Sequence, residues 1–429
     1  MCARLRVFIA IAVCAIGLGR GILLAGAAPA AEPLRLDAVV AEALERNPEI
    51  QAARHRWKAA QERATQAAAL DDPEAKIEFW NTPEHLDISR TGNTIFGLSQ
   101  RFPYPGKLGL KESLAVKEAE VAAAQLKAKE VEVAAQAKTA YYEAFLSQKA
   151  IQLHHQQIDI LKDFFAIANA RFRAGKGAQV DVLKASVELS KLFNELPVLE
   201  QQRESGKAKL SVILNRVPQS PLAEPLEPTG PRARQTLEDL QQMAIQNRPE
   251  LLALNIEIAR SQTAIALAQK QYYPDFNIMV SRFQNFGQRD GFGGMVTMSL
   301  PFSFWTKPKY DAGVREAAAN QDSVKASYQV LKNQVLFEIK DLLVKIEAAE
   351  KLLTLYKTTI IPQAQQTLES ARVNYQTGKV EFLTLLDAER ALRDFQLEYY
   401  RALTVFEQRM GDLERAIGVE LGSDKGGTK

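Results

Sequence analysis

The chain shows two different patterns of hydrophobic and polar positions. Over residues 108–170, apolar side chains recur every three or four positions in a segment rich in Ala, Lys, Glu and Gln, which predicts a helix. No proline interrupts residues 106–196, and a helix over 108–170 would be about 95 Å long at 1.5 Å per residue. Because a globular core cannot use that length, the pattern favours an extended coiled coil. A matching helical segment begins at Asp311, and we expect a kink or break in it at Pro362.

Four shorter segments alternate apolar and polar residues with a period of two, which predicts strands. They form two hairpins, at about 75–103 and about 275–304. Their apolar members are Ile77, Phe79, Phe96, Leu98, Phe102, Phe276, Ile278, Val280, Phe292, Val296, Met298, Leu300 and Phe302. Each segment has about 9 to 11 residues, the length of a tilted strand that crosses a bilayer, and aromatic residues lie near the ends. Half-buried hairpins of a soluble α+β protein would alternate in the same way, so the pattern alone allows both interpretations.

The whole pattern occurs twice. Pro48-Glu49-Ile50 recurs 201 residues later as Pro249-Glu250-Leu251, and Phe102-Pro103 recurs 198 residues later as Leu300-Pro301. Phe172, Gly175 and Lys176 recur 203 residues later as Tyr375, Gly378 and Lys379. An offset that stays nearly constant over most of both halves indicates a tandem duplication.

The duplication suggests a division of the mature chain into four parts. They are a first repeat (31–217), a proline-rich connector (218–234), a second repeat (235–420) and a flexible tail (421–429). Five of the 18 prolines fall in the connector, so we expect it to be extended rather than helical.

Residues 1–30 have the layout of a secretory signal peptide. Arg4 and Arg6 precede an apolar run over 7–18, and Ala28-Pro29-Ala30 forms an A-x-A cleavage site. The alternative, a membrane anchor, needs about 20 apolar residues, more than this run contains. Both cysteines lie in this segment, so the mature chain is expected to form neither disulfides nor thiolate metal sites. Its removal also balances 51 basic against 51 acidic residues, and a neutral chain has no electrostatic footprint for nucleic acid.

Four strands cannot close a barrel, and an open sheet edge in lipid would leave backbone groups without partners. If the hairpins cross a membrane, several copies of the chain must therefore share one barrel. Two, three or four copies would give 8, 12 or 16 strands, and only the larger barrels leave an open pore.

The sequence resembles the TolC-like outer-membrane efflux proteins over nearly all of the mature chain. The resemblance rests on the duplicated unit, the Asn47-Pro48-Glu49 start, the turn over 102–107 (FPYPGK) and two aromatic-x-x-Gly turns, at 172–185 and 375–388. It implies a mixed α/β membrane protein, a homotrimer with a shared 12-stranded β-barrel in outer-membrane lipid and a long α-helical coiled-coil tunnel in the periplasm. It also implies a periplasmic adaptor and an inner-membrane transporter of the RND type as partners. The Pro-Gly-Lys turn looks more like the heavy-metal-exporting branch than the multidrug branch.

The resemblance also implies roles for residues at the two glycine turns. Asp181 and Asp387 match acidic residues that constrict the tunnel mouth, and Tyr375 belongs to the same periplasmic aperture. A second acidic position of the family falls on Thr384 here, and an arginine partner falls on Val380, so the charged set is incomplete. In a trimer, three copies of each aspartate would form an acidic ring that favours cations. Stabilisation of a helix N-terminus is the alternative role of Asp181.

The same turns are implied to form the periplasmic tip where an adaptor docks. The residues concerned are Phe172, Gly175, Lys176, Gly378 and Lys379, and Tyr375 is expected to be exposed with them. Independently of any partner, Gly175 and Gly378 are expected to end their helices in the left-handed conformation.

The sequence contains no sign of catalysis. It lacks a G-x-x-x-x-G-K-[ST] loop, a G-x-S-x-G elbow and a mature cysteine nucleophile, so we expect neither an enzyme nor a cofactor. His154 and His155 would point about 100° apart on a helix and are expected to be surface residues rather than metal ligands. Met295 and Met298 are expected on opposite faces of a strand, in packing roles.

The leading functional hypothesis is a passive outer-membrane export channel of a tripartite efflux system. A type I secretion channel and a periplasmic coiled-coil adaptor or scaffold are the alternatives. An adaptor would carry a single helical hairpin flanked by β-rich domains, rather than two equivalent strand hairpins in a duplication.

Overall fold

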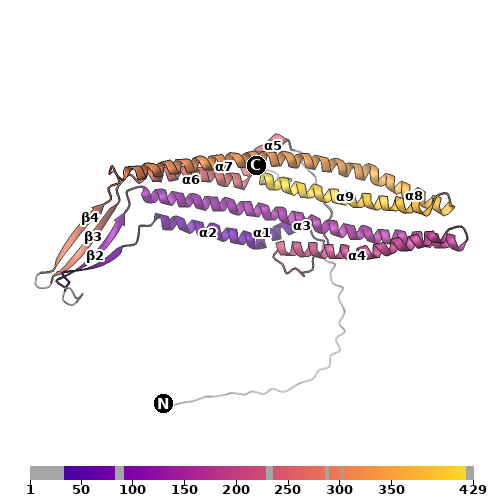
Figure 1. Ribbon diagram of the computed structural model, residues 1–429, viewed down its shortest axis with the longest axis horizontal. Coiled ribbons are helices and arrows are strands. Elements are labelled where there is room, and N and C mark those ends of the chain that lie inside the picture. Colours follow the sequence, from indigo (N-terminus) through magenta and orange to yellow (C-terminus); the bar gives the residue numbers. More distant parts are fainter. Residues whose placement is uncertain (1–32, 83–90, 229–234, 286–288, 302, 422–429) are drawn as a thin grey trace, which may run out of the picture.

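The computed structural model describes residues 33–82, 91–228, 235–285, 289–301 and 303–421. The chain is elongated, with strands at one end and two helical turns at the other (Figure 1). The expected signal peptide (1–30), residues 229–234 of the connector and residues 422–429 of the tail lie outside the described residues.

The elements follow the same order in both repeats, which confirms the duplication. The first repeat contains α1 (Leu36–Arg46), α2 (Pro48–Ala68), β1 (Glu74–Trp80), β2 (Asn93–Phe102), α3 (Lys107–Arg173) and α4 (Gln179–Ile213). The second contains α5 (Leu237–Asn247), α6 (Pro249–Lys270), β3 (Phe276–Asn285), β4 (Gly291–Met298), α7 (Lys307–Leu355), the π-helical turn η2 (Tyr356–Ile360), α8 (Ile361–Thr377) and α9 (Phe382–Ile417).

The expected irregularity at Pro362 takes the form of the π-helical turn η2. Pro362 has no backbone N–H and cannot donate to the carbonyl of Thr358, four residues earlier. The helix widens directly before the proline, as π-bulges do where the regular bonding pattern is interrupted. At an offset of 203 residues the first repeat has Asp159, and α3 continues without a break for 67 residues.

The four strands form one antiparallel sheet in the order β1-β2-β3-β4. The hairpins of the two repeats join through β2 and β3, so β1 and β4 are the sheet edges. Strand β4 ends at Met298, so the prediction that Leu300 belongs to it is wrong. Pro301 lacks the N–H that a longer ladder would need. Phe302, also predicted in this strand, lies outside the described residues.

The strand register gives the sheet two chemically different faces. Residues paired directly across strands share a face, and Ile77 pairs with Phe96, Phe96 with Arg282 and Arg282 with Phe292. This mostly apolar face also carries Phe79, Leu98, Phe102, Phe276, Ile278, Val280, Val296 and Met298, and its polar members are Thr94, Gln100, Arg282 and Gln284. The other face is mostly polar and carries Glu74, Lys76, Glu78, Asn93, Ser99, Arg101, Asn277, Ser281, Asn285 and Thr297, together with the apolar Trp80, Ile95, Met279, Phe283 and Met295.

The methionines follow this register. Met295 pairs with Met279 on the polar face, whereas Met298 pairs with Phe276 on the apolar face. The two residues therefore face opposite sides, as expected from their spacing.

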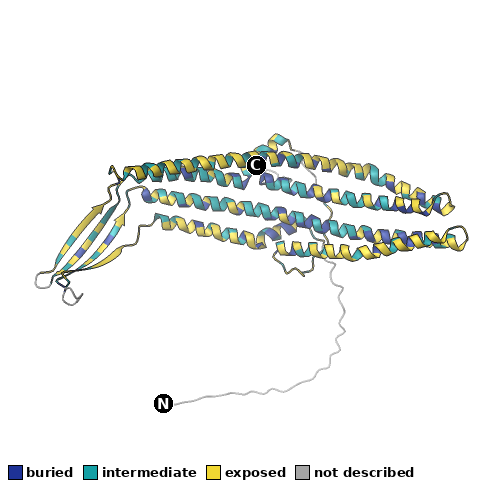
Figure 2. Ribbon diagram, in the orientation of Figure 1, coloured by how far each residue is buried: buried dark blue, intermediate teal, exposed yellow. Residues whose placement is uncertain are grey.

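In the part of the chain that the structure describes, the helices pack around three apolar clusters. One cluster belongs to the first repeat and includes Ile50 and Tyr141, and another belongs to the second and includes Ile339 and Leu413. The third lies near the helical turns and joins both repeats, with Phe164 of α3 and Phe382 of α9 among its members. Figure 2 shows the buried residues on the helices, while most strand residues are exposed or intermediate.

The described part of the connector is extended, as its prolines predict, and is fixed to the start of the chain. Leu34 forms a parallel bridge with Pro225, and the Tyr141 hydroxyl lies 2.9 Å from the carbonyl of Leu34 and from the amide of Leu226. This contact holds the link between the repeats against α3.

Among the described residues, no helix combines the length and the apolar character that crossing a membrane would require.

Candidate functional site

Both helical turns at the free end are closed by left-handed glycines. Gly175 has φ 69° and Gly378 has φ 80°, values that other residues rarely adopt. In each turn the amide of the lysine that follows the glycine donates to the carbonyl five residues back, from Lys176 to Arg171 (2.9 Å) and from Lys379 to Asn374 (2.8 Å). These are Schellman motifs, which satisfy the last carbonyls of α3 and α8.

The two turns expose different residues, although the repeats align them. Phe172 is 42% exposed, and Lys176, Lys379 and both glycines are exposed as well. Tyr375, the counterpart of Phe172, is only 2% exposed, so the expectation that it faces outward is wrong. Its ring packs at 5.2 Å from that of Phe382, inside the cluster that joins the repeats.

Burial of Tyr375 directs its hydroxyl to Asp181. The hydroxyl donates to Oδ2 of Asp181 at 3.1 Å, which links α8 of the second repeat to the first turn of α4. Burial and the nearby Asp181 carboxylate raise the pKa of Tyr375 to about 12, with Arg171 opposing them. The hydroxyl therefore keeps its proton at neutral pH and remains a donor.

Asp387 is not part of this contact. Its side chain is 62% exposed and lies 3.5 Å from Arg390, one turn along α9. Arg390 also lies 2.5 Å from Glu188 of α4. This ion pair is a second polar contact between the repeats, in addition to the hydrogen bond of Tyr375 with Asp181. Lys191 and Arg390 hold the pKa of Glu188 below its ordinary value, although burial opposes them.

Glu389, two residues after Asp387, is a buried acid that the sequence alone did not point to. It is 3% exposed, and burial raises its pKa to about 7, with Arg393 opposing the shift most strongly. Its carboxyl contacts Gln157 of α3, whose buried Oε1 has no hydrogen-bond partner among the described residues. The Gln157 contact lowers the pKa of Glu389, so it acts with Arg393 against the effect of burial.

The histidine prediction is half wrong. His155 is exposed, but His154 is 5% exposed, and its Nε2 lies 2.7 Å from the carbonyl oxygen of Leu192 on α4. The packing of α4 against α3 covers one of two adjacent residues that a helix directs to different sides. Within the described ranges, no cluster of three or more His, Cys, Asp or Glu side chains is placed to hold a metal.

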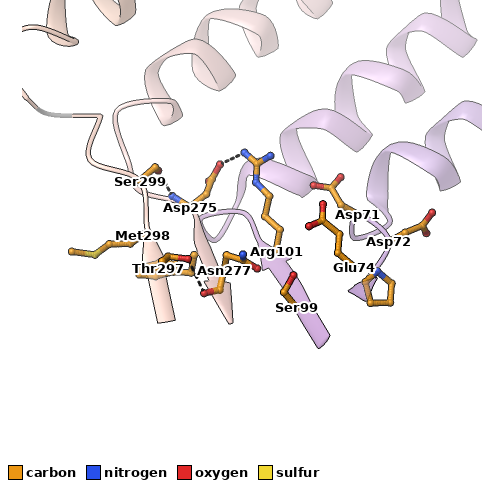
Figure 3. Close-up of a pocket in the computed structure, with 12 residues that line it drawn as sticks. Asp71, Asp72, Glu74, Ser99, Arg101, Asp275, Asn277, Thr297, Met298 and Ser299 are labelled. Atoms are coloured by element: carbon orange, nitrogen blue, oxygen red, sulfur yellow. Dashed lines mark hydrogen bonds and ion pairs between the residues drawn. The ribbon is translucent and has the colours of Figure 1, made fainter. Parts of the chain in front are cut away.

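A second polar region lies where the strands meet the helices. An open cavity of about 650 Å³ has Asp71, Asp72 and Glu74 on one side and Asp275 on the other. Figure 3 shows Arg101 between these groups, with an ion pair of 3.0 Å to Asp275. The backbone amide of Asp275 donates to Ser299 at 2.9 Å, so this residue ties β2, β3 and the end of β4 together.

A family model named outer membrane efflux protein matches residues 39–216 and 240–419, one match in each repeat. The chain belongs to this family.

Relatives and solved structures of outer membrane efflux proteins agree with the architecture. Cobalt-zinc-cadmium resistance protein CzcC of Cupriavidus metallidurans is 25% identical over 395 residues, 91% of each chain. The outer-membrane channel OprN superposes with a TM-score of 0.75 at 18% identity over 90% of both chains. VceC of Vibrio cholerae gives 0.75 at 19% identity, over 90% of this chain and 96% of its own. The two structural likenesses concern the fold.

Family membership assigns a location to each part of the molecule. The four strands belong to the outer membrane, in a barrel that three copies share, and the helices form a tunnel in the periplasm. In membrane barrels the apolar side of each strand meets lipid and the other lines the lumen, so we expect the more apolar face of this sheet to meet lipid. As an efflux protein of this family the chain is a channel and not an enzyme, and it works with periplasmic adaptors and an inner-membrane pump.

Proposed function

We propose that this channel exports heavy-metal cations and that its tunnel is narrowed at the helical turns by Asp181, Asp387 and Tyr375. The hydrogen bond from Tyr375 to Asp181 is the main support for the proposed aperture, because it joins the two repeats at the free end of the helices. A contact between repeats at this end sets how far apart the two turns lie.

The charges at this end favour cations. Asp181 and Asp387 occupy equivalent regions of the two repeats, and three copies would surround the opening with carboxylates. Such rings attract cations and repel anions in channels. Arg390 partly neutralises Asp387, at 3.5 Å, so Asp181 and Asp387 contribute unequally.

The aperture is tested by single-channel recordings of the purified trimer in planar bilayers. Asp181→Ala and Asp387→Ala should raise conductance and lower cation selectivity. Asp159→Ala is the matched control, because it removes an exposed α3 carboxylate about 20 Å from the turn at 1.5 Å per residue. Unchanged conductance and selectivity in both aperture variants would mean that these aspartates only stabilise helix ends.

We propose that the exposed turn residues are the docking site of the adaptor. Phe172 offers an apolar anchor, and Lys176 and Lys379 place one positive charge on each turn. Gly175 and Gly378 close both turns in the left-handed conformation, but only the first turn adds an exposed aromatic side chain. Phe172→Asp should weaken co-purification with the adaptor, while Phe193→Asp, at an exposed position within α4, should not.

The cargo proposal is supported by the name of CzcC, a cobalt-zinc-cadmium resistance protein that aligns over 91% of this chain. The implied pump is a transporter of the RND type. In a host that lacks its own metal-export channel, the chain with its pump and adaptor should restore growth on cobalt, zinc or cadmium. Restored tolerance to an organic drug without tolerance to any of the three metals would contradict the cargo assignment.

A further inference from the structure

Arg171, in the last turn of α3, touches both helical turns at once. Its guanidinium donates to the backbone carbonyl of Tyr375 in the second turn and, through Nη2, to that of Lys176 in the first at 3.0 Å. Its Cζ also lies 4.5 Å from the centre of the Tyr375 ring. One side chain thus fixes the backbone and the ring of Tyr375 relative to α3.

This arrangement depends on properties of arginine that lysine lacks. The planar guanidinium directs several N–H groups in fixed directions and can stack on an aromatic ring while it donates. Both carbonyls lie at or just beyond helix C-termini, where cations are favoured. The Tyr375 carbonyl also accepts from the Gly378 amide at 3.0 Å, so Arg171 adds a second donor to it.

The turns leave room for this side chain. A Cβ atom at Gly378 would lie 3.1 Å from Nη2 of Arg171, and one at Gly177 would lie 3.0 Å from the Cβ of Arg171. The contact is also one-sided. The offset of 203 residues matches Arg171 with Asn374. The second repeat therefore has no arginine at the matching position to make the same contact with the first turn.

We propose that Arg171 is a positioning residue for the aperture. It holds the second turn against the first and orients the Tyr375 ring so that the hydroxyl reaches Asp181. The inference rests on the proposed aperture, and Arg171 acts through Tyr375 rather than on the cargo.

The test compares Arg171→Lys with Arg173→Lys in the purified full-length trimer. Arg173 is exposed on the same helical turn, so the control makes the same chemical change outside the contact. The first readout is hydrogen exchange of the backbone amides over 374–381, which does not depend on transport. Arg171→Lys should accelerate exchange there by about tenfold, the equivalent of 1.4 kcal/mol, and Arg173→Lys should leave it unchanged.

The second readout is single-channel conductance. Arg171→Lys should raise it, and combining Arg171→Lys with Tyr375→Phe should raise it little beyond Tyr375→Phe alone, because both act on the same hydrogen bond.

The outcomes separate this inference from the aperture itself. If Tyr375→Phe and Asp181→Ala widen the channel while Arg171→Lys changes neither exchange nor conductance, the positioning role is overturned and the aperture stands. If Arg171→Lys accelerates exchange but none of the three variants changes conductance, the aperture is elsewhere and the positioning role falls with it.

Discussion

The ammonium group of Lys107 lies 2.7 Å from Oδ1 of Asp275. Lys107 begins α3 in the first repeat and Asp275 directly precedes β3 in the second, so the pair joins the repeats where barrel meets tunnel. Asp275 also accepts from the amide of Tyr104 at 3.0 Å, and the Lys107 side chain is only 4% exposed. The left-handed Gly106, at φ 90°, is the turn that directs Lys107 inward.

Substituting Asp275 should lower the free energy of unfolding more than substituting Lys107. Asp275→Asn leaves a buried ammonium without its carboxylate, and we expect a loss on the order of 3 kcal/mol. In Lys107→Met, Asp275 keeps Arg101 and the Tyr104 amide, so a loss of about 1 kcal/mol is expected. Thermal unfolding of the two purified variants measures the difference. Equal destabilisation would show that the ammonium is not effectively buried.

A charge on the lipid face of β4 should impair assembly, and a charge on the pore face should not. Val296 and Thr297 are exposed neighbours on opposite faces of the strand. Val296→Lys should cost about 2–4 kcal/mol if the site lies near the bilayer midplane, whereas Thr297→Lys should be tolerated. Phe96→Lys on β2 should behave like Val296→Lys. The measurement is the amount of heat-resistant trimer in the outer membrane, and equal yields from all three variants would contradict the assignment of faces.

Asp181 and Tyr375 should contribute separately to conductance and selectivity. Tyr375→Phe removes the donor of the 3.1 Å hydrogen bond and should widen the opening while the carboxylate charge remains. Asp181→Asn keeps an acceptor oxygen but no charge, so it should lower cation selectivity with a smaller change in conductance. Bilayer recordings in a salt gradient give both quantities. Identical effects of the two variants would argue against this division.

Glu389 should make the stability of the helical end depend on pH. Its pKa rises from an ordinary value of 4.5 to about 7 in the folded chain, so folding takes up a proton between these values. The raised pKa does not lower the free energy of unfolding below pH 4.5. Between pH 4.5 and 7 the loss of unfolding free energy grows, and above pH 7 it stays constant at about 3 kcal/mol. Glu389→Gln should therefore gain stability relative to wild type as pH rises from 4 to 8. Glu398→Gln, on the same helix with a side chain that is 46% exposed, should show no such trend in melting temperature.

Much of the fold follows from the sequence, because it depends on periods and repeats that a single chain displays. The period of two in the strand segments also fixed which residues share a face, as Met295 and Met298 show. The positions of Tyr375, His154 and Glu389 depend instead on packing between helices far apart in the chain. Repeat alignment equates Phe172 with Tyr375, yet only the latter is buried. One feature of the sequence does distinguish the two turns, because Arg171 of the first repeat is matched by Asn374 in the second. Such a difference between otherwise matching turns indicates that their surroundings differ.

The sheet has consequences for mixed populations of chains. Since β1 and β4 are the edges of the sheet within one chain, each copy must pair both edges with its neighbours to close the barrel, which gives three seams for three copies. One chain with a blocked β4 edge therefore prevents closure of a barrel that also contains two wild-type copies. In a cell that expresses wild-type and mutant chains and assembles them at random, the fraction of fully wild-type trimers is the cube of the fraction of wild-type chains. Lesions at these two strands should therefore be dominant, whereas loss of expression of one copy of the gene is not.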